Sequence, residues 1–244
     1  MERLTQLELD ILKFAGRQRC VRPEHIEHRF EVSRATAYRR PGSLTERGLL
    51  ASFEGISTGG RVFAATREGL ATASLPLRPA EPTTWFLPHD EAMTSVVCEL
   101  ERQHVDCLTE REIVARGRMM RDGRHEFELE EVRNGRRVQH RPDVVCELPD
   151  TDSFIAIEVE LSPKNVDRWR DILRAFDRRI HVDGFIGVLY VAGPDARGSR
   201  IAALANETGL GARFQLRQTS DLDLLGGLVA IVNADAAPTE SVEA

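Results

Sequence analysis

The chain has 244 residues, of which 41% are hydrophobic and 30% charged, a balance that excludes collagen-like, coiled-coil and wholly disordered proteins. Its longest apolar runs, 185–193 and 224–232, are strand-sized and too short for a membrane helix, so we expect no membrane partner. The first residues lack the basic-then-apolar order of a secretion signal, which predicts a cytoplasmic location. The four cysteines form no CxxC pair and indicate buried free thiols rather than zinc ligands.

The net charge of −6 is distributed unevenly along the chain. Residues 1–75 contain 12 basic and 9 acidic side chains, whereas residues 76–244 contain 21 and 30. The acidity therefore belongs to the second part. The first part has the positive balance that contact with nucleic-acid phosphates favours.

Four prolines between residues 74 and 88 mark the predicted boundary between two domains. The stretch has no sustained apolar period, and its prolines are typical of a stiff linker. We therefore predict a first domain over residues 1–73 and a second over residues 89–232. Residues 233–244, rich in alanine and acids, are predicted to be a disordered tail.

Local signals in the first domain predict three helices in succession. Thr5 and Glu8 form a capping box ahead of an apolar period of helical spacing. Proline at its first position favours a second helix over residues 23–30. Ser33 is the expected cap of a third helix over residues 34–40.

Pro41 is expected to end or kink this third helix, because proline removes a hydrogen-bond donor and disfavours helical geometry at the preceding residue. Ser43 and Glu46 then form a capping box for a separate short turn. Strands over residues 50–56 and 61–65 follow, joined by a glycine-containing turn, and a fourth helix begins after them.

This succession resembles the winged helix-turn-helix fold over residues 4–72. The most specific elements are the helix after Ser33, the Arg47-Gly48-Leu49-Leu50 segment and the glycine-tipped hairpin. The resemblance implies a recognition helix in the major groove of double-stranded DNA and a wing against the backbone or minor groove. The residues that answer to these DNA-binding roles are Arg34, Tyr38, Arg39, Arg40 and Arg61. A protein-interaction domain whose arginines only face solvent is the alternative.

The second domain shows an α/β pattern of helices and strands. An arginine-rich segment over residues 116–141 is expected to form an extended hairpin. The other predicted elements are a helix over 89–104, strands over 108–113, 143–148 and 154–161, a helix from Pro163 to about 179, a strand over 185–191, a helix over 198–208 and a strand over 213–216.

Acidic residues inside these apolar strands are candidates for chemistry. Glu158 and Glu160 share one face of a strand, because side chains alternate with a period of two. Buried acids are costly unless they are solvated, paired or bound to a cation. Asp143, which begins the adjacent strand after Pro142, completes an oxygen cluster suited to Mg²⁺ or Mn²⁺.

The order of elements over residues 89–192 resembles the PD-(D/E)XK nuclease-like superfamily. In that comparison Asp143 and Glu158 correspond to the metal ligands, and Glu160 occupies the position at which the superfamily usually has lysine. Lys164, one helical turn downstream, would supply the missing positive charge, so the implied catalytic set is Asp143, Glu158, Glu160 and Lys164. Both halves together resemble the replication-relaxation family of bacterial plasmids, phages and integrative elements. This implies a nucleoid-associated, DNA-binding accessory protein of replication or transcription regulation.

Two interpretations of the acidic residues stay open: a metal site, or ion pairs with arginines of residues 116–141 in a degenerate nuclease-like domain. Three functions follow. The first is a sequence-specific DNA-binding regulator or replication accessory whose second domain mediates contacts or homodimerisation. The second is a Mg²⁺-dependent endonuclease targeted by its winged helix, and the third is a protein-interaction adaptor without DNA affinity.

Overall fold

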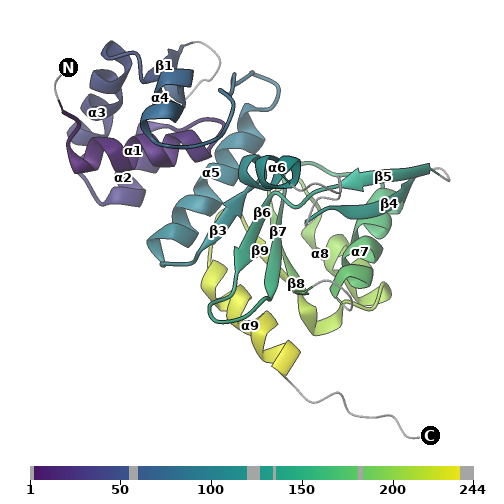
Figure 1. Ribbon diagram of the computed structural model, residues 1–244. Coiled ribbons are helices and arrows are strands. Elements are labelled where there is room, and N and C mark those ends of the chain that lie inside the picture. Colours follow the sequence, from purple (N-terminus) through teal and green to yellow (C-terminus); the bar gives the residue numbers. More distant parts are fainter. Residues whose placement is uncertain (1–2, 55–59, 120–126, 134–135, 181–183, 237–244) are drawn as a thin grey trace, which may run out of the picture. The chain divides into compact units, whose positions relative to one another are not determined.

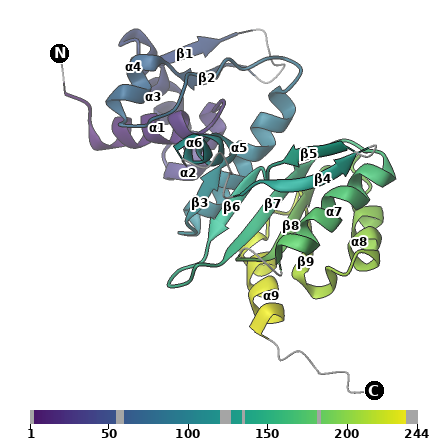
Figure 2. The ribbon, with the colours of Figure 1, turned by 45° about the vertical axis from the view of Figure 1, so that its right-hand side comes forward.

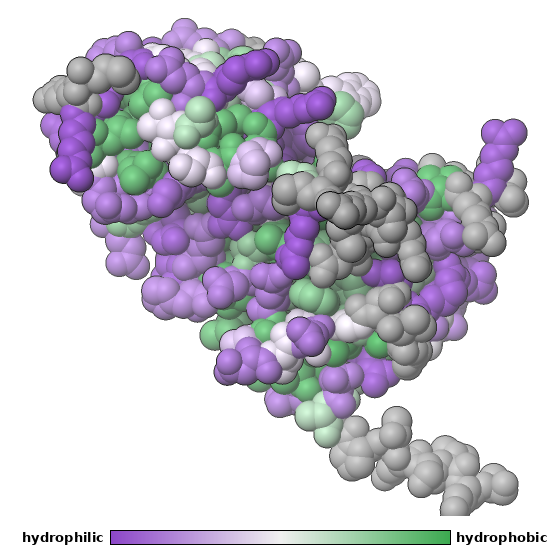
Figure 3. Space-filling model, in the orientation of Figure 1, coloured by the Kyte–Doolittle hydropathy of each residue, from purple (hydrophilic) through white to green (hydrophobic). Residues whose placement is uncertain are grey.

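The protein forms two compact units in a computed structural model, and its fold is α/β overall (Figure 1). Unit 1 comprises Met1–His104 and Leu108–His125, and unit 2 comprises Val105–Cys107 and Glu126–Ala244. The structure describes residues 3–54, 60–119, 127–133, 136–180 and 184–236. Within those ranges, no helix combines the length and the apolar character needed to cross a membrane. On the face drawn in Figure 3, hydrophilic side chains are interspersed with smaller hydrophobic patches.

Unit 1 is built from helices and one antiparallel hairpin. Its elements are α1 (Gln6–Arg17), α2 (Pro23–Phe30), α3 (Arg34–Glu46), β1 (Leu50–Phe53), β2 (Val62–Ala65), α4 (Arg67–Thr72), α5 (Leu87–Arg102) and α6 (Glu110–Met119). The predicted caps are confirmed: Thr5 and Glu8 form a capping box for α1, and Ser33 Oγ accepts from the backbone N–H of Thr36 at 3.3 Å. The predicted hairpin turn lies largely outside the described residues.

The predicted end of the third helix at Pro41 is wrong, because α3 continues through that residue to Glu46. Ser43 does not cap a new turn: its carbonyl accepts from the N–H of Arg47 at 3.2 Å. A proline inside a helix costs about 3 kcal/mol, whereas burying one leucine side chain contributes roughly 1.5–3 kcal/mol. Both Pro41 and Leu44 are buried, so packing of the second half of α3 offsets the lost hydrogen bond.

Helix α5 belongs to unit 1, although the predicted boundary places it in the second domain. The hydroxyl of Thr94 donates to the carbonyl of Cys20 at 2.9 Å, and Cys98 Sγ donates to the carbonyl of His25 at 3.3 Å. Arg29 Nε also lies 2.6 Å from Glu101 Oε2. These contacts attach α5 to α2 and to the turn before it, and the predicted linker lies within this unit.

The strand predicted over residues 108–113 is mostly helix. Only Cys107–Thr109 form a strand, β3, and α6 begins at Glu110. The N–H of Thr109 donates to Glu112 Oε2 at 2.9 Å, and the N–H of Glu112 donates to Thr109 Oγ1 at 3.4 Å. This reciprocal capping box starts the helix and stops the strand.

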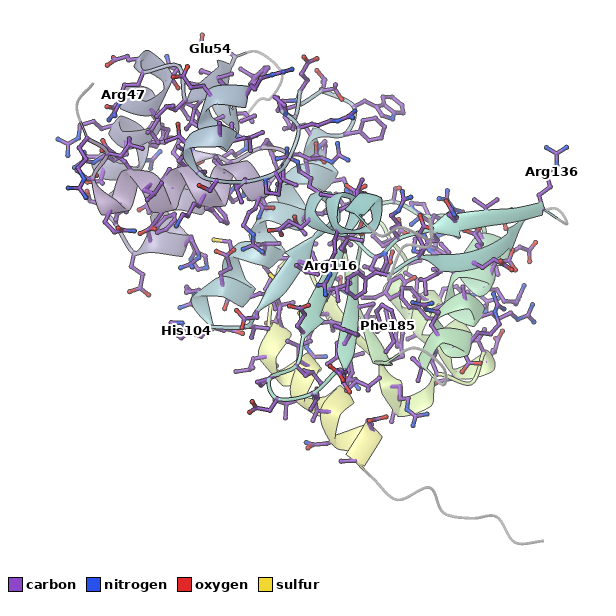
Figure 4. All side chains as sticks on the ribbon, viewed as in Figure 1. Arg47, Glu54, His104, Arg116, Arg136 and Phe185 are labelled. Carbon is purple, nitrogen blue, oxygen red and sulfur yellow. The ribbon has the colours of Figure 1, made fainter. Side chains whose placement is uncertain are left out.

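Unit 2 contains a mixed five-stranded sheet in the order β3-β6-β7-β8-β9. Strand β7 is antiparallel to β6 and parallel to β8, which is parallel to β9. The segment before β6 contains a separate hairpin, β4–β5, and the exposed Arg136 projects from its end (Figure 4). The elements are β4 (Leu129–Arg133), β5 (Arg136–His140), β6 (Val144–Glu147), β7 (Phe154–Glu160), α7 (Val166–Ile180), β8 (Phe185–Ala192), α8 (Gly198–Glu207), η1 (Gly211–Arg213), β9 (Phe214–Gln218) and α9 (Leu224–Ala236).

Helices cover both faces of this sheet: α7 and α8 lie on one face, and α9 packs on the other (Figures 1 and 2). Close packing of α9 requires Gly187 in β8, where an added Cβ would lie 2.4 Å from Ile231. The apolar run over residues 224–232 lies in α9 and is helical. Helix α9 also includes the first residues of the predicted tail, up to Ala236. The remaining tail residues, 237–244, lie outside the described residues.

Helix α7 begins at Val166, so the predicted start at Pro163 is wrong. The side-chain oxygen of Asn165 accepts from the N–H of Asp167 at 2.8 Å. Asn165 thus caps this helix.

Candidate functional site

The outward side of α3 presents a cationic and aromatic surface, which we call the α3 face and define as Arg34, Tyr38 and Arg39. All three side chains are exposed, whereas Ala37 on the opposite side is fully buried. The Arg34 guanidinium lies 5.7 Å from the centre of the Tyr38 ring, and the Tyr38 hydroxyl donates to Glu24 Oε1 at 2.9 Å. Within the described part of the chain, the Arg39 side chain has no hydrogen bond or ion pair. The α3 face therefore offers one unpaired guanidinium and one stacked on an aromatic ring.

The other two predicted DNA contacts, Arg40 and Arg61, are engaged in ion pairs. Arg40 Nη1 donates to Glu8 Oε1 at 3.0 Å, and Glu8 is buried. The backbone N–H of Thr5 and, more weakly, Arg40 hold the pKa of Glu8 below its usual value. Arg61 Nη2 lies 2.8 Å from Oε1 of Glu54, which is labelled in Figure 4. Arg40 thus anchors α3 to α1, whereas the Arg61–Glu54 pair is exposed and contributes little stability.

In unit 2 the structure brings together the three acids singled out in the sequence, which we call the acidic cluster: Asp143, Glu158 and Glu160. Asp143 precedes β6, and its Oδ2 accepts from the N–H of Val159 in β7 at 2.8 Å. Glu158 and Glu160 are each only 3% exposed, and they lie on the same face of β7. That face is covered by α7, since Trp169 Nε1 donates to Glu160 Oε2 at 3.2 Å.

Glu158 forms a buried pair with His140, the last residue of β5. Nε2 of His140 lies 2.9 Å from Oε1 of Glu158. Burial opposes the charged form of His140, but Glu158 and, more weakly, Asp143 outweigh burial and raise the pKa of this imidazole. Burial raises the pKa of Glu158, and His140 opposes that shift. The two raised pKa values mean that the pair retains a proton to a higher pH than the isolated groups would.

Glu160 is paired with Lys164, which lies between β7 and α7 and remains partly exposed. Among the described residues, the partners of Glu158 and Glu160 are thus His140 and Lys164, and several of the arginines predicted to pair with these glutamates lie outside the described part of the chain. Imidazole and ammonium groups take that role because the end of β5 and the loop after β7 meet above the same strand face.

Besides His140, sequence reasoning missed a second residue of this region, Tyr190. It pairs with Glu158 in the parallel register of β7 and β8, and its side chain is 1% exposed. The Tyr190 hydroxyl has no hydrogen-bond partner in the described part of the chain. Burial and, next, the charges of Glu158 and Glu160 raise the pKa of this phenol well above its usual value. A strand register cannot be read from one sequence, whereas His140 was detectable as the start of the His-Arg-Pro-Asp run that ends at Asp143.

The acidic cluster does not fit a divalent cation in this arrangement. Glu158 shares its carboxylate with His140, and Glu160 with Lys164 and Trp169. Among the described residues, no three His, Cys, Asp or Glu side chains are grouped so as to hold a metal ion. In this structure the carboxylates of Glu158 and Glu160 are thus engaged by side-chain partners rather than grouped as metal ligands.

No protein-family model matches this chain, and comparison with curated proteins and with solved structures also found no match. The resemblances to the winged helix, to PD-(D/E)XK nucleases and to the replication-relaxation family stay predictions.

Proposed function

We propose that the protein binds double-stranded DNA through the α3 face. The observation that carries this proposal is the pair of exposed arginines five residues apart on α3, Arg34 and Arg39, with Arg39 free of any partner within the described residues. A guanidinium can donate two parallel hydrogen bonds to the O6 and N7 atoms of guanine, or to a phosphate. Tyr38 adds a flat apolar surface that also orients Arg34.

The buried side of α3 supports this role because it fixes the position of the exposed side. Ala37 and Leu44 are fully buried, and Arg40 is tied to Glu8 of α1. A recognition helix needs such an anchor, since a shift of its backbone would move both arginines relative to the base edges. The space beside Gly42 is open to an approaching DNA, since a Cβ added at this residue would have no atom within 4 Å.

The class of protein that this proposal describes is a winged-helix DNA-binding protein with a second α/β unit. Within that class, we propose a replication or transcription accessory protein of a bacterial mobile element. Support for this narrower role comes from the motifs in the sequence that resemble the replication-relaxation family. The pairing of Glu158 and Glu160 with His140 and Lys164 supports a nuclease-like unit that does not cut DNA.

Binding of the full chain to DNA tests this proposal. A DNA site would first be selected from random duplexes, and affinity would then be measured by fluorescence anisotropy over a range of salt concentrations. Arg39→Ala should weaken binding by about 5- to 150-fold, corresponding to roughly 1–3 kcal/mol for a base contact. The matched control is Arg200→Ala, because Arg200 is an exposed arginine of unit 2.

Two outcomes would contradict the proposal. Equal affinities of R39A, R200A and wild type would remove the α3 face from the interface. If wild type shows no salt-dependent affinity for any duplex, the protein-interaction adaptor becomes the better interpretation.

A further inference from the structure

Unit 1 contains a cavity of about 370 Å³ that plays no part in the proposed contact with DNA. Its walls are the proline-rich segment 76–80, Arg19 just after α1, and one side of α6. The volume is in the range of pockets that take small molecules, roughly 300–1,000 Å³. Apolar side chains, including Pro76 and Val114, form part of the lining beside three arginines.

The most buried of these arginines, Arg111, has no carboxylate partner among the described residues. Its Nη1 donates to the carbonyls of Gly16 and Gln18 at 2.6 and 2.5 Å, and its Nη2 donates to the carbonyl of Arg78. Carbonyl groups accept hydrogen bonds from the guanidinium but do not neutralise its full positive charge. The guanidinium therefore retains its positive charge at the wall of the cavity.

The lining of the cavity contains three arginines and no acidic residue, although Glu110 and Glu112 lie close enough to Arg111 to raise its pKa. Arg19 is paired with Glu110 at 2.9 Å and lies 3.8 Å from Asp90, while the Arg78 side chain is exposed and has no partner in the described chain. Burial raises the pKa of Asp90 to about 6, so this carboxyl group is still mostly ionised at pH 7 and offsets part of the charge of Arg19. Burial and, next, repulsion from Arg19 lower the pKa of Arg111 to about 10. An anion in the cavity would relieve this repulsion.

We propose that this cavity binds a small organic phosphate of about mononucleotide size. The phosphate group would meet Arg78 and Arg111, since guanidinium groups match phosphate oxygens in geometry and charge. The organic part would lie against Pro76 and Val114. This inference goes beyond the proposed function, because it assigns unit 1 a small-molecule site separate from the α3 face.

Titration calorimetry of the full chain with two probes, AMP and inorganic phosphate, tests the proposal. Arg78→Gln is the informative variant, because it removes a cavity charge while the Arg78 carbonyl that Arg111 uses remains. Arg67→Gln is the matched control: it removes an equal charge from an exposed position at the start of α4. We expect saturable binding of AMP, stronger than that of inorganic phosphate, which R78Q weakens at least tenfold and R67Q leaves unchanged.

Three outcomes would overturn the proposal. The first is the absence of saturable binding by either probe, and the second is an equal effect of R78Q and R67Q. The third concerns the other source of phosphate, the DNA backbone: if neither probe binds and R78Q weakens duplex binding tenfold, these arginines contact DNA. A separate thermal melt of R78Q checks that its unfolding temperature matches that of wild type.

Discussion

Removing the His140 imidazole tests how strongly the acidic cluster depends on its positive partners. In the His140→Ala variant, Glu158 would remain buried in β7 and lose the group that lies 2.9 Å from its Oε1. Removing one partner of a buried ion pair costs about 3–5 kcal/mol, because an uncompensated charge stays in the interior. We expect a loss of this size at pH 7, or a fall of roughly 10 °C in the unfolding midpoint.

Urea unfolding followed by tryptophan fluorescence measures this loss in unit 2. Trp169 in α7 is buried and its indole N–H donates a hydrogen bond to Glu160, so its fluorescence emission reports on the folding of unit 2. The other tryptophan, Trp85, belongs to unit 1 and is 86% exposed. Trp85→Phe therefore removes the second signal at little cost and serves as the background for every variant.

The double variant H140A/E158Q separates loss of charge compensation from loss of packing. Glutamine at position 158 is neutral, so the double variant should regain at least half of the stability lost in H140A. If the double variant is no more stable than H140A, the reasoning is refuted. The loss would then come from the contact of His140 with Phe176, whose ring centres lie 6.1 Å apart.

The pH dependence of H140A supplies an independent check on the same reasoning. Burial raises the folded-state pKa of Glu158 above its unfolded value. A carboxyl group of this kind contributes stability at low pH and loses that contribution as the pH rises through the folded pKa. The deficit of H140A relative to background should therefore be smaller at pH 5 than at pH 7. A deficit that grows toward pH 5 would contradict this assignment.

Three further predictions concern other positions. Gly42→Ala should stabilise unit 1 by about 0.5–1 kcal/mol in urea unfolding, since Gly42 lies inside α3 with open space beside it; a loss of stability would show that this position is strained. Asp90→Asn should stabilise the protein by about 1–2 kcal/mol at pH 8 and by little at pH 4, because the raised pKa of about 6 makes the charged form costly above that pH; a gain independent of pH would rule out this cause. Mg²⁺ and Mn²⁺ should support no cleavage of duplex DNA by the purified chain, and metal-dependent cutting that Asp143→Asn and Glu158→Gln each abolish would restore the nuclease interpretation.

Local sequence signals were sufficient where hydrogen bonds between near neighbours decide the structure. The caps at Thr5 and Ser33 and the proline at the start of α2 are of this kind. The course of α3 through Pro41 depends instead on burial of Leu44, a tertiary contact that no local rule contains. The start of α6 was available locally, because Thr109-x-x-Glu112 is itself a capping box.

The candidate site divides in the same way. The period of two in β7 was enough to place Glu158 and Glu160 on one face. The neighbours of these glutamates could not be predicted from the same period, because His140 belongs to a separate hairpin and Tyr190 to a parallel strand. Contacts between strands depend on register, which forms only when the whole sheet assembles.

The path of the chain through its two units constrains how this protein could be shortened or recombined. The chain leaves unit 1 after His104, contributes Val105–Cys107 to unit 2, and then returns to build α6. A fragment that ends at residue 104 would lack Glu112, whose carboxylate accepts from Arg17 at the end of α1. No single cut separates the units, so a recombination event with one breakpoint would disrupt at least one of them. We therefore expect the two units to be inherited as one piece, unlike modules joined by a simple tether.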